Sequence, residues 1–178
     1  MQTKLLWLDM EMTGLDPERD RVLEVATIVT DGDLREIAVG PELVIRQSAE
    51  TLAAMVPWCA LTHGESGLTQ RSLESLTSTA DADALTSAFV RQHFPYGGAI
   101  LAGNSIHQDR RFIRAWFPEL EALLHYRMLD VSAVRIAVDA WYPDVTATRP
   151  AKRMGHRAFG DIRESIAELD FYRAAAFK

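Results

Sequence analysis

The sequence predicts an α/β fold in which a mixed five-stranded sheet carries helices on both faces. Three segments rich in apolar or β-branched residues follow one another before residue 46, and turn-forming residues separate them. After residue 98, two further short apolar segments alternate with amphipathic segments, which is the order of a strand–helix unit. Hydrophobic residues make up 48% of the 178 residues and charged residues 25%, so a mainly disordered chain is excluded.

Local patterns predict each of the first three strands. A continuous apolar run that ends in acids is typical of a buried central strand, and the segments after it are rich in β-branched residues. Gly14 and Pro17 predict a turn after the first strand, and the Asp-Gly-Asp triplet at 31–33 predicts a hairpin. The predicted strands cover residues 4–11, residues 22–30 and a third segment that ends at Ile45.

Helices dominate the rest of the predicted fold. The pattern is helical from residue 48 to residue 93, and Leu85, Ala88, Phe89 and Gln92 recur at helical spacing near its end. Two more strands are predicted at residues 99–103 and 125–131, and three more helices at residues 104–117, 132–141 and 160–175.

Capping and apolar spacing locate parts of these later helices. Asn104 or Ser105 is expected to cap the helix that follows the fourth strand, because both side chains can accept a hydrogen bond from an early helical amide. Ile162, Ile166 and Leu169 form an apolar stripe on the last helix, and we expect that stripe to face the core.

Composition bounds the compartment and the partners. Residues 1–178 hold no linker, internal repeat or long apolar segment, so we expect a single domain that does not span a membrane. Cys59 is the only cysteine, which excludes an intrachain disulfide and a cysteine-based zinc site and favours a cytoplasmic location. The formal net charge of −6 weighs against a nucleic-acid partner, because proteins that bind long polyanions usually carry a positive surface.

Asp9 and Glu11 end the first predicted strand two residues apart. Side chains at i and i+2 point to the same face of a strand, so both carboxylates are directed together beside a loop. Two neighbouring carboxylates repel each other and are costly to desolvate, and a bound hard cation would remove that cost. The alternative is that both residues are ordinary surface acids at the end of a strand. An isolated Asp-x-Glu pattern favours this alternative.

Asp109, His156 and Asp161 add to this pair from two other parts of the chain. Asp109 follows the fourth predicted strand by about one helical turn, and its alternative role is an ion pair with Arg110 or Arg111. Asp161 is predicted in the first turn of the last helix, and His156 in the loop before that helix. The alternative for His156 is an exposed residue without a role in the site. The four acids offer oxygen ligands that suit two Mg²⁺ or Mn²⁺ ions, and a histidine suits the role of general base.

Four motifs, taken in chain order, resemble those of the oligoribonuclease family. They are DMEMTGLDPERDRVLEVA, GNSIHQDRRF, HYRMLDVS and GHRAFGDIRESIAEL, and the resemblance runs from Lys4 to Tyr172. This family belongs to the Asp-Glu-Asp-Asp-His group of 3′→5′ exonucleases, which have a ribonuclease H-like fold. The resemblance therefore implies hydrolysis of RNA of two to a few nucleotides to 5′-mononucleotides.

The same resemblance implies a role for each matching residue. It makes His156 the general base and Asp9, Glu11, Asp109 and Asp161 the ligands of two divalent cations. The residues that it places on the substrate are Leu15 between the bases, Trp58 and His63 in the nucleotide pocket, and Ser105, Arg127 and Ser132 at the 5′ phosphate. The family is homodimeric, and Tyr126 matches a tyrosine that reaches across the dimer interface.

Each of these implied contacts has an ordinary structural alternative. Leu15 can cover the core as a loop residue, and Trp58 can be part of the core, as large aromatic residues usually are. Arg127 can pair with an acid such as Asp130, and Tyr126 can pack on its strand.

The sequence departs from the family pattern in two places. Gly160 stands where the family commonly has an acid, so one negative charge beside Asp161 is missing and the first helical turn is less stable than with alanine. We expect activity to survive this change with an altered metal requirement. The segment 146–155 also differs from the usual loop, and its sequence has no explanation here.

Three functions remain open from the sequence. The first is an exoribonuclease for very short RNA, the second is an exonuclease of the same group that trims or proofreads longer strands, and the third is a non-catalytic nucleotide-binding relative. The complete set of acids and His156 argues against the third. The acidic balance favours the first, because a substrate of two nucleotides requires little positive surface and no long nucleic acid has to bind.

Overall fold

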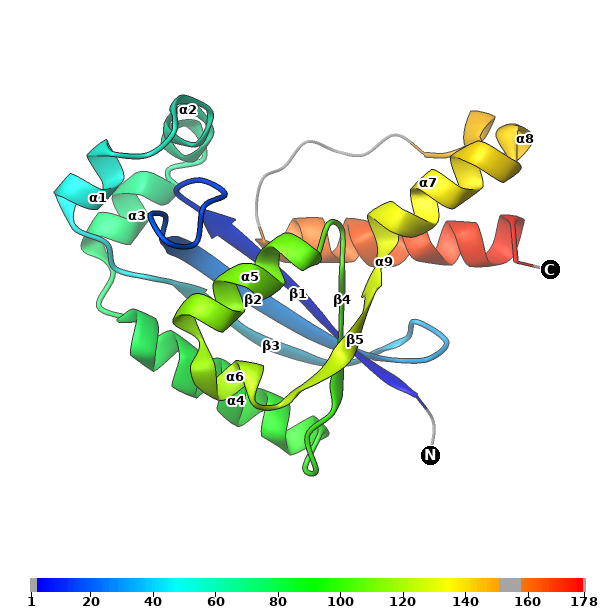
Figure 1. The fold of residues 1–178 in the computed structure, drawn as a ribbon, viewed down its shortest axis with the longest axis horizontal. Helices are drawn as coiled ribbons and strands as arrows, with labels where there is room; N and C mark the ends of the chain where they lie inside the picture. The colour runs from blue at the N-terminus through cyan, green and yellow to red at the C-terminus, as the bar shows by residue number, and fades with distance from the viewer. Residues whose placement is uncertain (1–2, 151–157, 178) are drawn as a thin grey trace.

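The structure, a computed structural model, describes residues 3–150 and 158–177. Five strands form one mixed sheet in the order β3-β2-β1-β4-β5, with β1 at its centre (Figure 1). β2 pairs antiparallel with both β1 and β3, whereas β4 and β5 continue the sheet parallel to β1. The strands are β1 Lys4–Met12, β2 Val22–Asp31, β3 Glu36–Val44, β4 Ala99–Gly103 and β5 Leu124–Asp130.

Helices pack on both faces of this sheet, as predicted. α4 and α5 cover one face, and α7 and α9 cover the other (Figure 1). None of the helices within the described residues has the length and apolar character that crossing a membrane requires. The described helices are α1 Ala49–Ala53, α2 Pro57–Glu65, α3 Leu68–Glu74, α4 Thr79–His93, α5 His107–Trp116, α6 Pro118–Glu121, α7 Val131–Trp141, α8 Pro143–Ala147 and α9 Ala158–Ala175.

Alternation along β1 divides its side chains between two cores. Leu8 and Met10 pack in the core beneath α4 and α5, whereas Trp7 packs in the core beneath α7 and α9. Because the side-chain period of a strand is two residues, Asp9 and Glu11 continue the row that contains Trp7. The face of the sheet that α9 covers is therefore apolar along most of β1 and acidic at its carboxyl end.

α4 confirms the helix that the spacing of Leu85, Ala88, Phe89 and Gln92 predicts. Leu85 and Ala88 are exposed, however, and Ala82 and Val90 face the core. Asp83 is buried on the same side as Ala82, because its carboxylate accepts hydrogen bonds at 2.9 Å from two backbone amides of α6. The spacing thus predicts the helix but not the face that it buries, since a fully bonded acid occupies part of that face.

α5 begins at His107, and the prediction that Asn104 or Ser105 caps it is wrong. The residue at the cap position is Ile106, which makes no side-chain capping bond. Ser105 has a φ of +50°, in the left-handed region, so the chain turns sharply between β4 and α5. Both polar side chains are directed instead to serines of α7 and α9.

The apolar stripe of α9 faces the core as predicted. Ile162 and Leu169 are buried, and Ile166 packs on the same cluster while partly exposed. α9 lies against β1 and β2, so its first turn is held beside the carboxyl end of β1 (Figure 1).

Candidate metal and nucleotide site

Three carboxylates lie close together at the carboxyl end of β1. Asp9 and Glu11 project from the face of β1 that α9 covers, and Asp161 lies in the first turn of α9. One carboxylate oxygen from each residue lies within 4.8 Å of the other two. The fold thus brings together acids that are about 150 positions apart in the sequence.

Asp109 reaches the same end of β1 from α5. Its side chain is buried, and its Oδ1 accepts a hydrogen bond at 2.9 Å from the backbone amide of Met10. Arg110 instead pairs with a glutamate of α6, and Arg111 donates to the carbonyl oxygen of Leu15. Within the described residues, Asp109 thus forms no ion pair with Arg110 or Arg111, which was its alternative role.

Burial raises the pKa of these carboxyl groups. Desolvation is the largest cause at Glu11, whose pKa rises to about 7, and repulsion from Asp161 and Glu24 adds to it. Desolvation also raises the pKa of Asp109 to about 8, although backbone hydrogen bonds oppose the rise. The pKa of Asp9 is well above its usual value because of burial first and the charge of Asp109 second. Acids that a fold desolvates side by side are typical of a functional site.

The donor set fits a hard divalent cation. All four side chains offer carboxylate oxygens, the ligand type that Mg²⁺ and Mn²⁺ prefer. A bound cation lowers the pKa of each neighbouring carboxyl and so removes the cost of holding the acids together. The acidic end of β1 could therefore hold a metal ion, and the desolvation of both acids does not support the alternative of two ordinary surface acids.

A fifth acid, Glu24, is buried near the carboxylate cluster and forms an ion pair with an arginine outside it. It is only 1% exposed and forms an ion pair with Arg71 of α3 at 3.0 Å. Its second oxygen lies 3.5 Å from the backbone amide of Ala158, the first residue of α9. Glu24 therefore connects β2 and α3 to the helix that carries Asp161.

A cavity of about 380 Å³ opens over the acids. Leu15 and Trp58 lie on its rim with 62% and 60% of their surface exposed, so neither is a core residue. His63 is buried in its wall, with Nε2 2.9 Å from the carbonyl oxygen of Met12. The structure thus brings the predicted base-contacting residues to one pocket together with Asp9, Glu11 and Asp109.

Ser105 lines this pocket, and Ser132 at the start of α7 contacts Ser105 from outside the lining residues. The Ser105 amide donates to the Ser132 hydroxyl and to the Asp130 carboxylate, both at 3.0 Å. Asp130 also accepts from the Ser132 amide at 2.9 Å, and its other oxygen lies 3.2 Å from Nδ1 of His107. We call Ser105, Asp130 and Ser132 the serine wall. The Asp130 carboxylate bonds with Ser105, Ser132 and His107. Within the described residues it forms no ion pair with Arg127, which was the alternative role of that arginine.

Tyr126 and Arg127 lie on β5, which is an edge strand of the sheet. Tyr126 is 71% exposed and stacks on His125 with 4.4 Å between ring centroids. The Arg127 guanidinium lies 5.1 Å from the Tyr126 ring centroid. These contacts leave an exposed aromatic and a cation side by side on the sheet edge.

Two predictions concern the start of α9. The general base predicted at His156 lies outside the described residues, as does part of the segment 146–155. Gly160 is exposed in the first turn of α9, and a Cβ added there meets no described atom within 4 Å. The fold therefore places no steric demand for glycine at this position.

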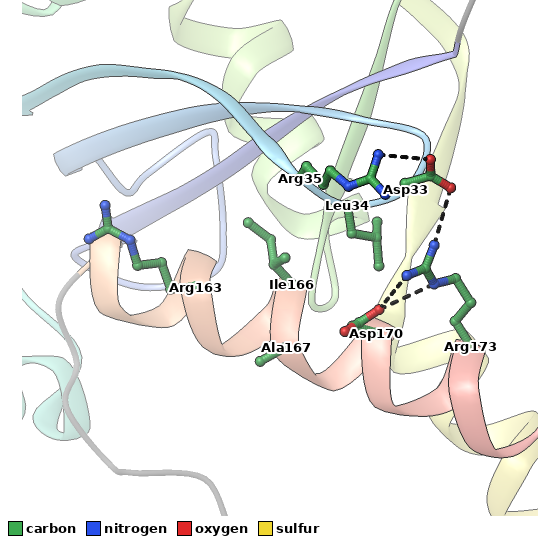
Figure 2. Close-up of a pocket in the computed structure, with 8 residues that line it drawn as sticks. All are labelled: Asp33, Leu34, Arg35, Arg163, Ile166, Ala167, Asp170 and Arg173. Carbon is green, nitrogen blue, oxygen red and sulfur yellow. Dashed lines mark hydrogen bonds and ion pairs between the residues drawn. The ribbon is translucent and has the colours of Figure 1, made fainter.

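A second hollow, of about 610 Å³, lies between α9 and the β2–β3 hairpin and has a different character (Figure 2). Arg173 lies within 3.4 Å of Asp33 and 2.8 Å of Asp170, and Arg35 also lies 3.4 Å from Asp33. Arg163 pairs with Glu36 at its edge, 3.6 Å away. Each arginine is thus matched by a carboxylate, and the hollow is lined by ion pairs.

The sequence model of the exonuclease family matches residues 6–169. The oligoribonuclease of Ectopseudomonas mendocina (strain ymp) is 54% identical over 169 residues, which cover 95% of this chain and 93% of that protein. The chain belongs to the oligoribonuclease family. The human protein named oligoribonuclease, mitochondrial, is 45% identical, with 100% of this chain and 75% of that protein covered.

Solved structures extend the oligoribonuclease comparison to the fold. A zinc-bound complex of Escherichia coli exonuclease I with single-stranded DNA superposes with a TM-score of 0.75 at 18% identity. It covers 100% of this chain, and this chain spans about two fifths of that one, 42% of its length. The likeness concerns the fold alone, and it confirms the predicted ribonuclease H-like architecture.

Sequence reasoning missed several members of this oligoribonuclease site. The sequence suggests Asp130 only as a partner for Arg127 and Asn104 only as a helix cap, yet both side chains form hydrogen bonds within or to the serine wall. Nothing in the sequence pattern singles out His107 or Glu24. The left-handed turn at Ser105 reorients this segment, and a single sequence carries no signal for that turn.

Proposed function

We propose that this chain is a metal-dependent 3′→5′ exoribonuclease that hydrolyses RNA of two to a few nucleotides to 5′-mononucleotides. The observation that carries the proposal is the carboxylate cluster of Asp9, Glu11 and Asp161 beside a pocket that is lined by Asp9, Glu11 and, from the serine wall, Ser105. The relatives named oligoribonuclease, which match over nearly the whole chain, support the choice of a short RNA.

The proposed substrate lies with its 3′-terminal nucleotide over the acids. Leu15 and Trp58 contact the bases from the rim, where both present exposed apolar surface. Ser105, Ser132 and Arg127 bind the 5′ phosphate, because hydroxyl groups and a guanidinium are suitable donors to a phosphate. A phosphate bound by these residues would mark the 5′ end of the substrate, which favours short RNA.

Two divalent cations, Mg²⁺ or Mn²⁺, held by Asp9, Glu11, Asp109 and Asp161 complete the proposed site. When bound, they supply Lewis-acid stabilisation of charge on the scissile phosphate and a water of lowered pKa. The protein holds the carboxylates in place, with Asp109 fixed to β1 by the Met10 amide.

His156 is the proposed general base. It accepts a proton from the attacking water, and the 3′ oxygen of the preceding nucleotide leaves from the opposite side of the phosphorus. A histidine suits this role because its ordinary pKa allows it to be neutral at physiological pH.

The proposal includes a homodimer and a cytoplasmic location. Tyr126 is the residue proposed to reach the partner's site, since it is an exposed aromatic on the edge strand β5. Sedimentation of the wild-type protein and of Tyr126→Ala tests the dimer. A wild-type monomer that remains fully active on dinucleotides contradicts this part.

A timed digest of 5′-labelled RNAs of two, three, seven and twenty nucleotides tests the function. We expect Mg²⁺- or Mn²⁺-dependent cleavage from the 3′ end, fastest on the dinucleotide and abolished by a chelator. Equal or faster cleavage of the twenty-nucleotide RNA supports an exonuclease for longer strands instead. Binding of the dinucleotide without turnover supports a non-catalytic relative.

A further inference from the structure

The side-chain amide of Asn104 contacts both α7 and α9 at the edge of the active-site pocket. Its Nδ2 donates to the Ser165 hydroxyl at 2.6 Å and lies 3.4 Å from a carboxylate oxygen of Glu168. Its Oδ1 accepts from the Ser132 hydroxyl at 3.2 Å. A single side chain from the β4–α5 turn therefore joins the first turn of α7 to the first half of α9.

On the side of α7, this contact ends in the serine wall. Ser132 donates its hydroxyl proton to Asn104 and accepts the amide proton of Ser105. The orientation of that hydroxyl is thus fixed from both sides. Asn104 therefore helps to orient the Ser132 hydroxyl against Ser105, which lines the pocket.

On the side of α9, the contact ends at the turn that carries Asp161. The Ser165 hydroxyl accepts from Asn104 and donates to the backbone carbonyl of Asp161 at 2.8 Å. Two successive hydrogen bonds thus link the side-chain amide of Asn104 to the backbone of Asp161, a candidate metal ligand.

Glu168 and Arg135 support this connection. Glu168 is 8% exposed and accepts two hydrogen bonds from Arg135 of α7, at 2.6 and 2.7 Å. Tyr172, one turn further along α9, donates to Glu168 at 2.8 Å. This charge-assisted pair holds α7 beside α9 at one point beyond Asn104, and the Asn104 contacts join the two helices nearer the pocket, at the ends that carry Ser132 and Asp161.

We propose that Asn104 is a positioning residue that sets the separation between the serine wall and the Asp161 turn, and thereby the preference for a dinucleotide. The proposal rests on the proposed function. In a dinucleotide the 5′ phosphate and the scissile phosphate are one nucleotide apart, so both binding groups must be held at one fixed separation. A longer RNA that does not use the serine wall lacks this requirement.

Three variants test the proposal. Asn104→Leu removes all the contacts at similar volume, Ser165→Ala removes only the link to Asp161, and Ser87→Ala is the matched control. Ser87 is a buried serine of α4 that does not line the pocket, and its hydroxyl donates to Asp83 at 3.2 Å. The measurements are kcat and KM on a 5′-phosphorylated dinucleotide and on a heptanucleotide, together with the melting temperature of each variant.

We expect Asn104→Leu and Ser165→Ala to lower kcat on the dinucleotide by about tenfold, because small displacements of reacting groups are costly. Their activity on the heptanucleotide should change by less than about threefold. Ser87→Ala should lower the melting temperature without changing the ratio between the substrates. An unchanged ratio in Ser165→Ala, or an equal loss on both substrates, overturns the proposal even if Asn104→Leu does not fold. A wild-type protein without dinucleotide preference refutes the proposed function instead.

Discussion

The Asp109 carboxylate accepts a hydrogen bond from the backbone amide of Met10 at 2.9 Å, between the two acids of β1. This bond joins α5 to the central strand across 99 positions of sequence. It orients Oδ1 of Asp109 toward the end of β1 where Asp9 and Glu11 lie. We expect this side chain to have two functions, attachment to the strand and metal binding.

Asp109→Asn separates these two functions experimentally. The amide oxygen of asparagine can still accept from Met10, so we expect the variant to fold, but it lacks the negative charge that a divalent cation requires. Hydrolysis of a dinucleotide should fall by at least about a hundredfold. Steady-state rates and circular dichroism measured on one sample check both statements. A variant with wild-type rate removes Asp109 from the catalytic set.

The raised pKa values of Glu11 and Asp109 predict an unusual pH dependence of stability without metal. Glu11 rises from 4.5 to about 7, and Asp109 from 3.8 to about 8, so the folded state binds more protons than the unfolded state between these limits. The free energy of unfolding therefore falls as the pH rises from about 4 to about 8, by up to about 1.4 kcal/mol per pH unit for each proton.

Urea denaturation in a chelator at pH 5.5, 7 and 8.5 measures this effect. Glu11→Gln cannot ionise, so the stability difference between this variant and the wild type should grow in favour of the variant as the pH rises. Adding Mg²⁺ should reverse the order, because the cation binds only the folded carboxylates. A difference that is independent of pH contradicts the prediction.

Most strands could be predicted because the sheet satisfies simple patterns. β1 is a continuous apolar run with strands on both sides, and the acids at its end stand out against that background. The period of two then assigns Asp9 and Glu11 to one face without any structural knowledge. The helical pattern of residues 160–175 likewise predicts the position of Asp161, which lies in the first turn of α9.

The face of α4 and the serine wall could not be predicted, because both depend on hydrogen bonds between distant segments. Asp83 is buried because two backbone amides of α6 donate hydrogen bonds to it. The sequence near Asp83 does not indicate that α6 packs there. Asn104 looks like a helix cap until the positive φ of Ser105 turns it toward α9. Buried polar groups follow tertiary contacts rather than periodicity.

The Glu24–Arg71 pair predicts a large difference between two arginine substitutions. Glu24 is 1% exposed, so Arg71→Met leaves a buried carboxylate without its cation and should cost about 2 kcal/mol, reduced from the usual range because Arg71 is partly exposed. Arg91→Met removes an ion pair with Glu119 in which both side chains are about half exposed, and should cost less than about 0.5 kcal/mol. Equal melting temperatures of the two variants contradict this account.

Gly160→Asp tests whether the missing acid of the family matters. Within the described residues, no atom lies within 4 Å of a Cβ at this position, which is in the first turn of α9, where a negative charge is favourable. We expect a gain in stability of about 0.5 to 1 kcal/mol, retained activity and a lower concentration of metal for half-maximal rate. Gly160→Ala separates helix stability from charge. An unchanged metal requirement in Gly160→Asp shows that the added charge has no effect on the metals.

Leu15 provides a test of the pocket rim that is independent of the acids. It is 62% exposed, so Leu15→Ala should change the melting temperature little, whereas loss of its contact with a base should raise KM for a dinucleotide by about tenfold. Leu85→Ala is the matched control, because Leu85 is 51% exposed on α4 outside the pocket. The value of kcat should stay near that of the wild type in both variants. If KM is the same in both, Leu15 makes no contact with the substrate.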